Sequence, residues 1–293
     1  MARMLLILLA VVVAAVAVVA CSPIRALNAI VSSDSYELTT DAYGAGERRR
    51  LDVYTPRATA ERVRPANGWP MVVFFYGGSW NRGERQEYRF VGEAMAARGI
   101  VTVIPDYRLY PEVRYPDFLK DNAAAMAWSL REAARLGADP KRVFVMGHSA
   151  GGYNAAMVAL DPRWLKAEGA KVTQLAGWIG LAGPYDFLPI ENPDARPVFF
   201  HPNSPPESQP IRYVAARAPR AFLGAAPEDT LVNPERNTRQ MATKLQAAGV
   251  PVTMQFYPRT SHVTLIGAFA APLRFLAPVL EDVVEFVKTA PPR

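Results

Sequence analysis

The sequence predicts an α/β protein with a mostly parallel central sheet that is covered by helices on both faces. Short β-branched or aromatic runs alternate with helical patterns of ten or more residues over most of the chain. The composition, 50% hydrophobic and 20% charged over 293 residues, is that of a globular chain with material for one large core. A single cysteine excludes an internal disulfide, so stability must come from that core.

The expected strands are short, and most of them alternate with the expected helices along the chain. The first reads RLDVYTP at 50–56 and alternates as a half-buried strand does. Further strands are expected at 71–76, 99–105, 142–146, 175–181, 220–225 and 252–257, and helices at 85–98, 117–136, 150–160, 234–248 and 271–289.

Residues 1–20 are predicted to be a cleavable secretory signal. Arg3 precedes an apolar run from Met4 to Ala20 that ends in small residues. The stretch from Val18 to Cys21 resembles the lipobox of bacterial lipoproteins, in which the cysteine is lipidated and becomes the mature N-terminus. This resemblance implies an exported, membrane-anchored lipoprotein of the cell envelope. Two alternatives to lipidation stay open, a plain signal peptide and an uncleaved anchor. Both place the domain outside the cytoplasm. With a plain signal peptide the protein would be periplasmic or secreted.

The rest of the chain reads as a tether and one domain. Residues 21–46 are polar and mixed, which favours a tether, and residues 47–293 form the domain. Within the domain, 184–210 holds eight prolines in 27 residues, which excludes a long helix or a central strand. A loop of this length is typical of a lid or binding segment, or of a disordered one. Because four apolar residues, Phe187, Leu188, Phe199 and Phe200, interrupt it, we expect an ordered flap with short turns rather than a flexible linker.

The charge pattern argues against a nucleic-acid partner. The formal net charge is +6, and the densest basic cluster is the short GERRRL at 46–51, which is typical of a solvated turn. The small excess of positive charge leaves only a modest attraction to anionic membrane surfaces.

Ser149 lies in a turn where an α/β sheet would present a nucleophile. The sequence GHSAG, 147–151, falls between the strand at 142–146 and the helix at 150–160. Ligands meet an open parallel sheet at the carboxyl ends of its strands, and a helix start also directs free amides toward an anion. A dinucleotide phosphate loop would need GxGxxG spacing, which is absent.

A serine hydroxyl needs a base, and the chain holds three histidines. His148 lies inside the turn, where neighbouring side chains diverge, and His201 lies in the proline-rich segment. His262 follows the strand at 252–257, so it is the candidate base. Asp229, which follows the strand at 220–225, is the candidate partner of the imidazole, with Glu228 as the fallback.

Amides for an anionic intermediate are expected in two places. In YGGSW, which follows the strand at 71–76, Gly78 and Ser79 can present amides beside that of Ala150. Trp80 is expected to pack this loop rather than touch substrate. Zinc hydrolysis is disfavoured because HExxH is absent and histidine is scarce, so neither a metal nor an organic cofactor is expected.

The chain resembles an α/β-hydrolase of the bacterial carboxylesterase type, related to the hormone-sensitive-lipase and feruloyl-esterase-like groups, over about residues 45 to 290. The resemblance is carried by YGGSW, PDYRLYPE at 105–112, GHSAGG, GPYDF at 183–187, PEDTLV at 227–232 and SHVTL at 261–265, and by the Ser, Asp, His order. The family's oxyanion loop usually begins with His, where this chain has Tyr76, so the tyrosine hydroxyl is expected to support the loop from a different distance.

The resemblance implies a serine carboxylic-ester hydrolase that forms an acyl-enzyme on a small-molecule ester. The phenylalanines of the flap favour an apolar pocket and small to medium acyl or aryl esters. Two alternatives stay open. One is attack on a C–N bond, as in arylformamidases or peptidases of the same fold, and the other is a catalytically inactive binding lipoprotein of the envelope.

Overall fold

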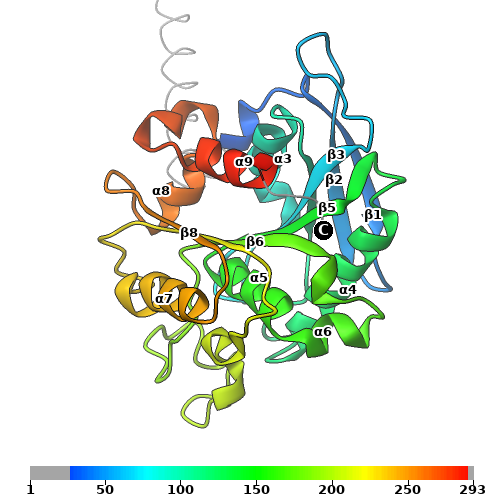
Figure 1. The fold of residues 1–293 in the computed structure, drawn as a ribbon. Helices are drawn as coiled ribbons and strands as arrows, with labels where there is room; N and C mark the ends of the chain where they lie inside the picture. Colours follow the sequence, from blue (N-terminus) through cyan, green and yellow to red (C-terminus); the bar gives the residue numbers. More distant parts are fainter. Residues whose placement is uncertain (1–26, 290–293) are drawn as a thin grey trace, which may run out of the picture.

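The computed structural model describes residues 27–289, and one eight-stranded sheet forms its centre (Figure 1). The sheet has the order β1-β2-β4-β3-β5-β6-β7-β8. The strands are β1 (Tyr36–Ala42), β2 (Arg50–Pro56), β3 (Trp69–Phe75), β4 (Val101–Pro105), β5 (Ala138–His148), β6 (Leu175–Leu181), β7 (Ala221–Ala225) and β8 (Val252–Phe256).

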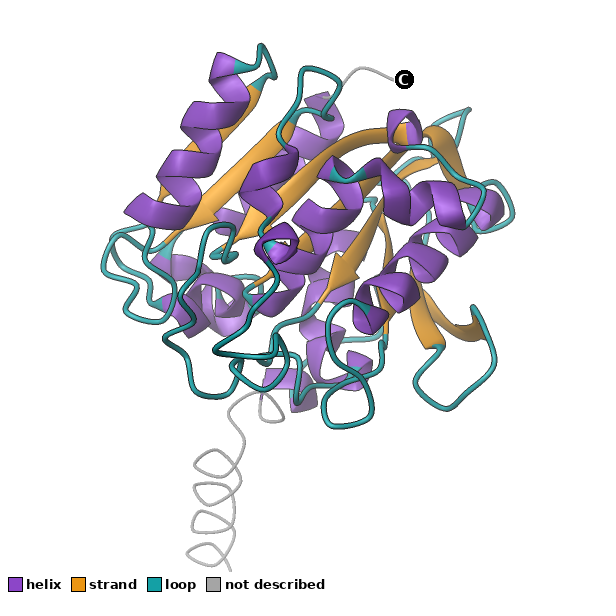
Figure 2. Ribbon diagram, turned by 90° about the horizontal axis from the view of Figure 1, so that it is seen from below, coloured by secondary structure: helices purple, strands orange, loops and turns teal. Residues whose placement is uncertain are grey.

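Helices cover both faces of the sheet. The helices are α3 (Arg89–Ala96), α4 (Asp117–Glu132), α5 (Ala150–Leu160), α6 (Pro162–Ala167), α7 (Gln240–Ala247), α8 (His262–Gly267) and α9 (Val279–Thr289). Figure 1 shows α3, α8 and α9 on one side and α4 to α7 on the other, and Figure 2 shows the latter layer in front of the strands. Short helical turns are η1 (Arg85–Tyr88), η2 (Val172–Gln174), η3 (Pro206–Ser208), η4 (Pro210–Tyr213), η5 (Glu235–Arg239) and η6 (Ala271–Leu276), of which η5 is a π-helix and the others are 3₁₀.

The predicted fold class is confirmed. β1, β2 and β4 pair antiparallel, and every pairing from β4 through β8 is parallel. β3 is apolar along its length because it is buried on both faces. Its side chains alternate between two core clusters, with Val72 and Phe74 in one and Val73 and Phe75 in the other. The parallel strands therefore end at a common edge, where the loops that follow β3, β5, β7 and β8 can meet.

The N-terminal region departs from one expectation. The predicted signal peptide, 1–20, and Cys21 lie outside the described residues. The tether expected over 21–46 is wrong for Tyr36–Ala42, which pairs along β2 as an edge strand. Four of its seven side chains are exposed in succession, so no alternation of hydrophobic residues marks this strand in the sequence, and the ladder of backbone hydrogen bonds defines it instead.

None of the helices within 27–289 combines the length and the apolar character that crossing a bilayer requires.

Candidate active site

Ser149 occupies the sharp turn between β5 and α5. Its backbone has φ 56° and ψ −124°, an uncommon conformation for a residue with a side chain. The flanking glycines are required by close packing, because a Cβ at Gly147 would lie 2.0 Å from the Gly151 carbonyl oxygen, and one at Gly151 would lie 1.9 Å from that of Phe75. The turn thus holds the serine at the carboxyl end of β5, directly before the first turn of α5.

A chain of two hydrogen bonds joins Ser149, His262 and Asp229. His262 Nε2 lies 2.8 Å from Ser149 Oγ, and His262 Nδ1 lies 2.6 Å from Asp229 Oδ2. Because a carboxylate accepts, Nδ1 carries the imidazole proton and Nε2 is free to accept the serine hydroxyl proton. The imidazole and the carboxylate are both buried, with His262 8% and Asp229 7% exposed. The three side chains proposed from the sequence therefore lie in contact.

Asp229 is held as an anion by its surroundings. Burial acts to raise the pKa of its carboxyl group, but hydrogen bonds from His262 and from the amides of Leu231 and Val232 outweigh burial and bring the pKa below its usual value. Glu228, the fallback for this position, is exposed to solvent, and the hydrogen bond from His262 goes to Asp229.

His262 is the first residue of α8, a helix that the sequence analysis did not expect. Ser261 caps this helix, and its hydroxyl accepts from the Thr264 amide while Thr264 Oγ1 accepts from the Ser261 amide. The capping box fixes the backbone beside the imidazole. The pattern SxxT was present in the sequence and could have signalled this helix.

His148, the last residue of β5, supports His262 through a hydrogen bond. The His148 ring is buried, and its Nε2 donates to the His262 carbonyl oxygen at 2.8 Å. The two rings lie 5.0 Å apart. This histidine was not a candidate base in the sequence, because neighbouring side chains diverge, yet the direction of its side chain brings it to the backbone of a distant segment. His201 lies exposed in the flap, away from Ser149.

The loop after β3 has an uncommon backbone conformation. Gly78, Ser79 and Trp80 all have positive φ angles, of 123°, 50° and 57°. Ser79 and Ala150 line a pocket together with Ser149, whereas Gly78 does not contribute to its walls. Trp80 packs the loop as expected, since its Nε1 donates to Asn154 Oδ1 of α5 at 2.9 Å, but it also lines the pocket.

Tyr76, at the start of this loop, is hydrogen-bonded to one buried and one partly buried charged side chain. Its hydroxyl donates to Asp106 Oδ1 at 2.8 Å and accepts from Arg48 at 2.9 Å. Burial, followed by the nearby Asp106 carboxylate, raises the pKa of Tyr76 well above its usual value, so the hydroxyl stays protonated as a donor. Arg48 also donates to the Gly83 carbonyl, which ties the far end of the loop to the same network. The tyrosine hydroxyl therefore joins the start of the loop to the same hydrogen-bond network as its far end.

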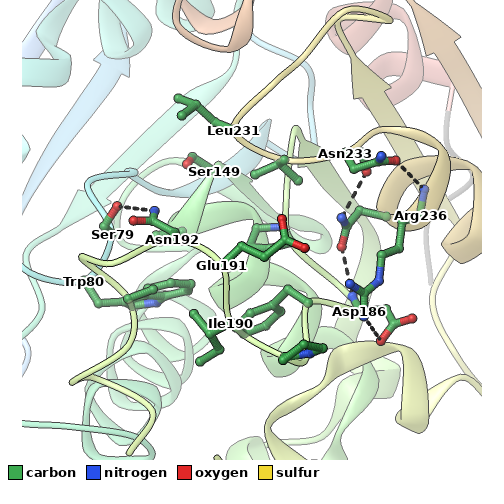
Figure 3. Close-up of a pocket in the computed structure, with 17 residues that line it drawn as sticks. Ser79, Trp80, Ser149, Asp186, Ile190, Glu191, Asn192, Leu231, Asn233 and Arg236 are labelled. Atoms are coloured by element: carbon green, nitrogen blue, oxygen red, sulfur yellow. Dashed lines mark hydrogen bonds and ion pairs between the residues drawn. The ribbon is translucent and has the colours of Figure 1, made fainter. Parts of the chain in front are cut away.

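The pocket beside Ser149 is a cavity of about 170 Å³ (Figure 3). Segment 184–210 forms much of its wall, and this segment folds as turns and short 3₁₀ helices, as the proline content predicts. Phe187 and Ile190 line the cavity, whereas Phe199 packs against Trp80 with ring centroids 4.8 Å apart. The flap therefore contributes to the core and to the pocket at once.

The flap is fastened to the loop after β3. Arg82 forms an ion pair with Asp194 at 3.1 Å, and Asn192 Nδ2 donates to Ser79 Oγ at 3.4 Å. Leu231 lines the pocket opposite the flap, and 64% of its surface is exposed. It forms an apolar part of the pocket rim beside Asp229. Within residues 27–289, no three His, Cys, Asp or Glu side chains are grouped as metal ligands would be.

The parallel sheet and the serine turn at the end of β5 define a class of protein. A family model described as alpha/beta hydrolase fold matches residues 72–266, which is more than half of the chain. The protein therefore belongs to the α/β-hydrolase fold family.

Named relatives of this chain are esterases. Esterase LipC of Mycobacterium tuberculosis is 30% identical over 225 residues, which are 70% of this chain and 54% of LipC. A probable isoprenylcysteine alpha-carbonyl methylesterase of Arabidopsis thaliana, ICMEL2, is 27% identical over 244 residues, 76% of this chain and 56% of the relative. The chain thus spans about half the length of these curated relatives.

Among solved structures, the hyperthermophilic esterase from the archaeon Pyrobaculum calidifontis has the same fold. It superposes with a TM-score of 0.75 over 91% of this chain and 88% of its own, at 21% identity.

Proposed function

We propose that this protein is a serine carboxylic-ester hydrolase that acts on small to medium acyl or aryl esters. The observation that carries the proposal is the continuous chain of hydrogen bonds from Ser149 through His262 to Asp229 beside a pocket. The relatives described above are named as esterases, which adds support to the proposal. The cavity of about 170 Å³ is smaller than the roughly 300–1,000 Å³ of sites for drug-sized ligands, which favours short acyl groups.

The reaction follows from the positions of the atoms. Ser149 Oγ attacks the ester carbonyl carbon while His262 Nε2 takes the hydroxyl proton, and the Asp229 carboxylate stabilises the imidazolium. The negative charge that forms on the carbonyl oxygen is bound by amides at Ala150 and the loop Gly78–Ser79, with the start of α5 adding its dipole. His262 then protonates the leaving alcohol, and water hydrolyses the acyl-enzyme by the reverse sequence.

A panel of p-nitrophenyl esters of increasing acyl length, assayed with the wild type and Ser149→Ala, tests the proposal. We expect turnover on the short esters and a loss of at least about a thousandfold in kcat in the variant. Equal rates for the two proteins would contradict the proposal. Aryl formamides and peptides run in parallel distinguish attack on an ester from attack on a C–N bond, since the same three side chains serve either reaction.

We propose in addition that the protein is exported and held at a membrane through lipidated Cys21. This rests on the sequence of residues 1–21 alone. Expression of the full chain and Cys21→Ser in bacteria fed a labelled palmitate gives the test. Label on the wild type alone is the expected result, and label on both chains or on neither would overturn it.

A further inference from the structure

The walls of the pocket carry one uncompensated charge. Among the residues that line the cavity, three are charged, namely Asp186, Glu191 and Arg236. Arg236 lies 3.5 Å from Asp186 and also donates to the Leu188 carbonyl, so these two charges offset each other. Glu191 forms no hydrogen bond or ion pair with any other residue of the described chain. The lining therefore has an excess of one negative charge.

Glu191 faces the space that a substrate would enter. It belongs to the flap, between Ile190 and Asn192, both of which also line the cavity. Figure 3 shows its carboxylate pointing into the pocket, on the side of Ser149 and Arg236 rather than away from them. Asn192 Nδ2 lies 3.4 Å from Ser79 Oγ of the loop after β3, so the residue that follows Glu191 lies beside that loop.

Aromatic rings stand near the same space. Trp80 and Phe187 both line the cavity, and their rings are stacked with centroids 6.3 Å apart and an interplanar angle of 21°. The face of an aromatic ring attracts a cation, and a carboxylate attracts it more strongly at the same distance. A positive group in this pocket would meet both, whereas a carboxylate or phosphate on a substrate would be repelled by Glu191.

We propose that Glu191 and the rings of Trp80 and Phe187 form a subsite for the cationic group of an ester, such as a quaternary ammonium or protonated amine. The inference rests on the proposed function, because it names the substrate class of the same pocket. Glu191 is a specificity residue here and takes no part in the proton transfers, which run through His262.

The sharpest test uses two esters of the same shape that differ only in charge. Choline acetate and 3,3-dimethylbutyl acetate are such a pair, since a neutral carbon replaces the quaternary nitrogen. Both are assayed with the wild type and with Glu191→Gln, which keeps the size of the side chain and removes its charge. Glu61→Gln is the matched control, because Glu61 is exposed in the loop before β3, at the opposite edge of the sheet from Ser149.

The wild type should hydrolyse the choline ester with a kcat/KM about three- to tenfold above that of the neutral ester, the range expected for one partly solvated charge pair together with a weak cation–π contact. In Glu191→Gln the ratio should lose most of this factor and fall to the smaller preference that the rings alone supply, and in Glu61→Gln it should stay at the wild-type value. Added NaCl should lower the wild-type ratio and leave that of Glu191→Gln unchanged, because salt screens the pair.

Two results would overturn the inference alone. A wild-type ratio of one or less, with the neutral ester turned over, would refute the cationic subsite and leave the proposed esterase function intact. A raised ratio that Glu191→Gln does not change would also refute it. Hydrolysis of neither ester would contradict the esterase function itself and this inference with it.

Discussion

His148 should make the stability of the protein fall as the pH falls below neutrality. Its ring is buried, Nε2 donates to the His262 carbonyl, and Nδ1 has no hydrogen-bond partner within the described chain. Burial, followed by the nearby His262, lowers the pKa of His148 from 6.5 to about 3. The folded protein therefore keeps this imidazole neutral over the whole range in which the unfolded chain becomes protonated.

The sign and the size of the effect follow from proton linkage. Below pH 6.5 the unfolded chain binds a proton at His148 that the folded state refuses, so acid favours unfolding until the pH reaches about 3. The limiting slope for one proton is about 1.4 kcal/mol per pH unit. Between pH 8 and pH 5 this single residue should therefore lower the free energy of unfolding by about 2 kcal/mol. That is a large share of the roughly 5–15 kcal/mol of a typical domain.

The measurement is urea unfolding of the wild type and His148→Gln at pH 8 and pH 5. Glutamine can still donate to the His262 carbonyl but cannot be protonated in this range, so it removes the linkage. Asp229 is present in both chains, and its lowered pKa adds stability that is lost only as the pH falls below its unfolded value near 4, outside the range used. The free energy of unfolding should drop by about 2 kcal/mol more in the wild type than in the variant. Parallel pH profiles would refute the reasoning.

Three further substitutions test the site. Asp229→Asn should lower kcat on a short ester by about 10³- to 10⁴-fold in steady-state kinetics, because the imidazolium loses its counter-charge. Glu228→Gln is the control and should leave kcat unchanged. Comparable losses of kcat in both variants would contradict the assignment of Asp229. Gly151→Ala should fail to give a native circular dichroism spectrum, since its Cβ would lie 1.9 Å from the Phe75 carbonyl oxygen, and a native melting curve would refute the packing argument. Tyr76→Phe should lower the free energy of unfolding by about 1–3 kcal/mol in urea, because a buried carboxylate loses a donor, and an unchanged midpoint would contradict that role.

The sequence predicted the inner strands of the sheet well because burial leaves a strong signal. The strands at 50–56 and 175–181 were placed at their observed bounds, since most of their side chains are buried in the sheet. The edge strand Tyr36–Ala42 was missed because its exposed side chains carry no hydrophobic alternation. The helix at His262–Gly267 was missed because six residues give too short a period to recognise.

The site was predictable to the level of segments and less so to the level of contacts. Strand ends in a parallel sheet converge, so Ser149, Asp229 and His262 could be chosen from position and scarcity. The choice between Asp229 and Glu228 needed coordinates, because two adjacent carboxylates differ only in which way the turn directs them. The support that His148 gives to His262 could not be foreseen, since it joins a side chain to the backbone of a segment more than a hundred residues away.

Treatment of the folded protein with diethyl p-nitrophenyl phosphate, followed by intact-mass and peptide analysis, tests the central claim most directly. An activated serine hydroxyl displaces p-nitrophenolate from this reagent, whereas an ordinary surface serine does not. We predict one diethylphosphoryl group on each wild-type chain, attached to Ser149, and no such group on Ser149→Ala or on the wild type unfolded in urea. A folded wild type that stays unmodified, or that carries the group on another residue, would contradict the assignment of Ser149 as the nucleophile.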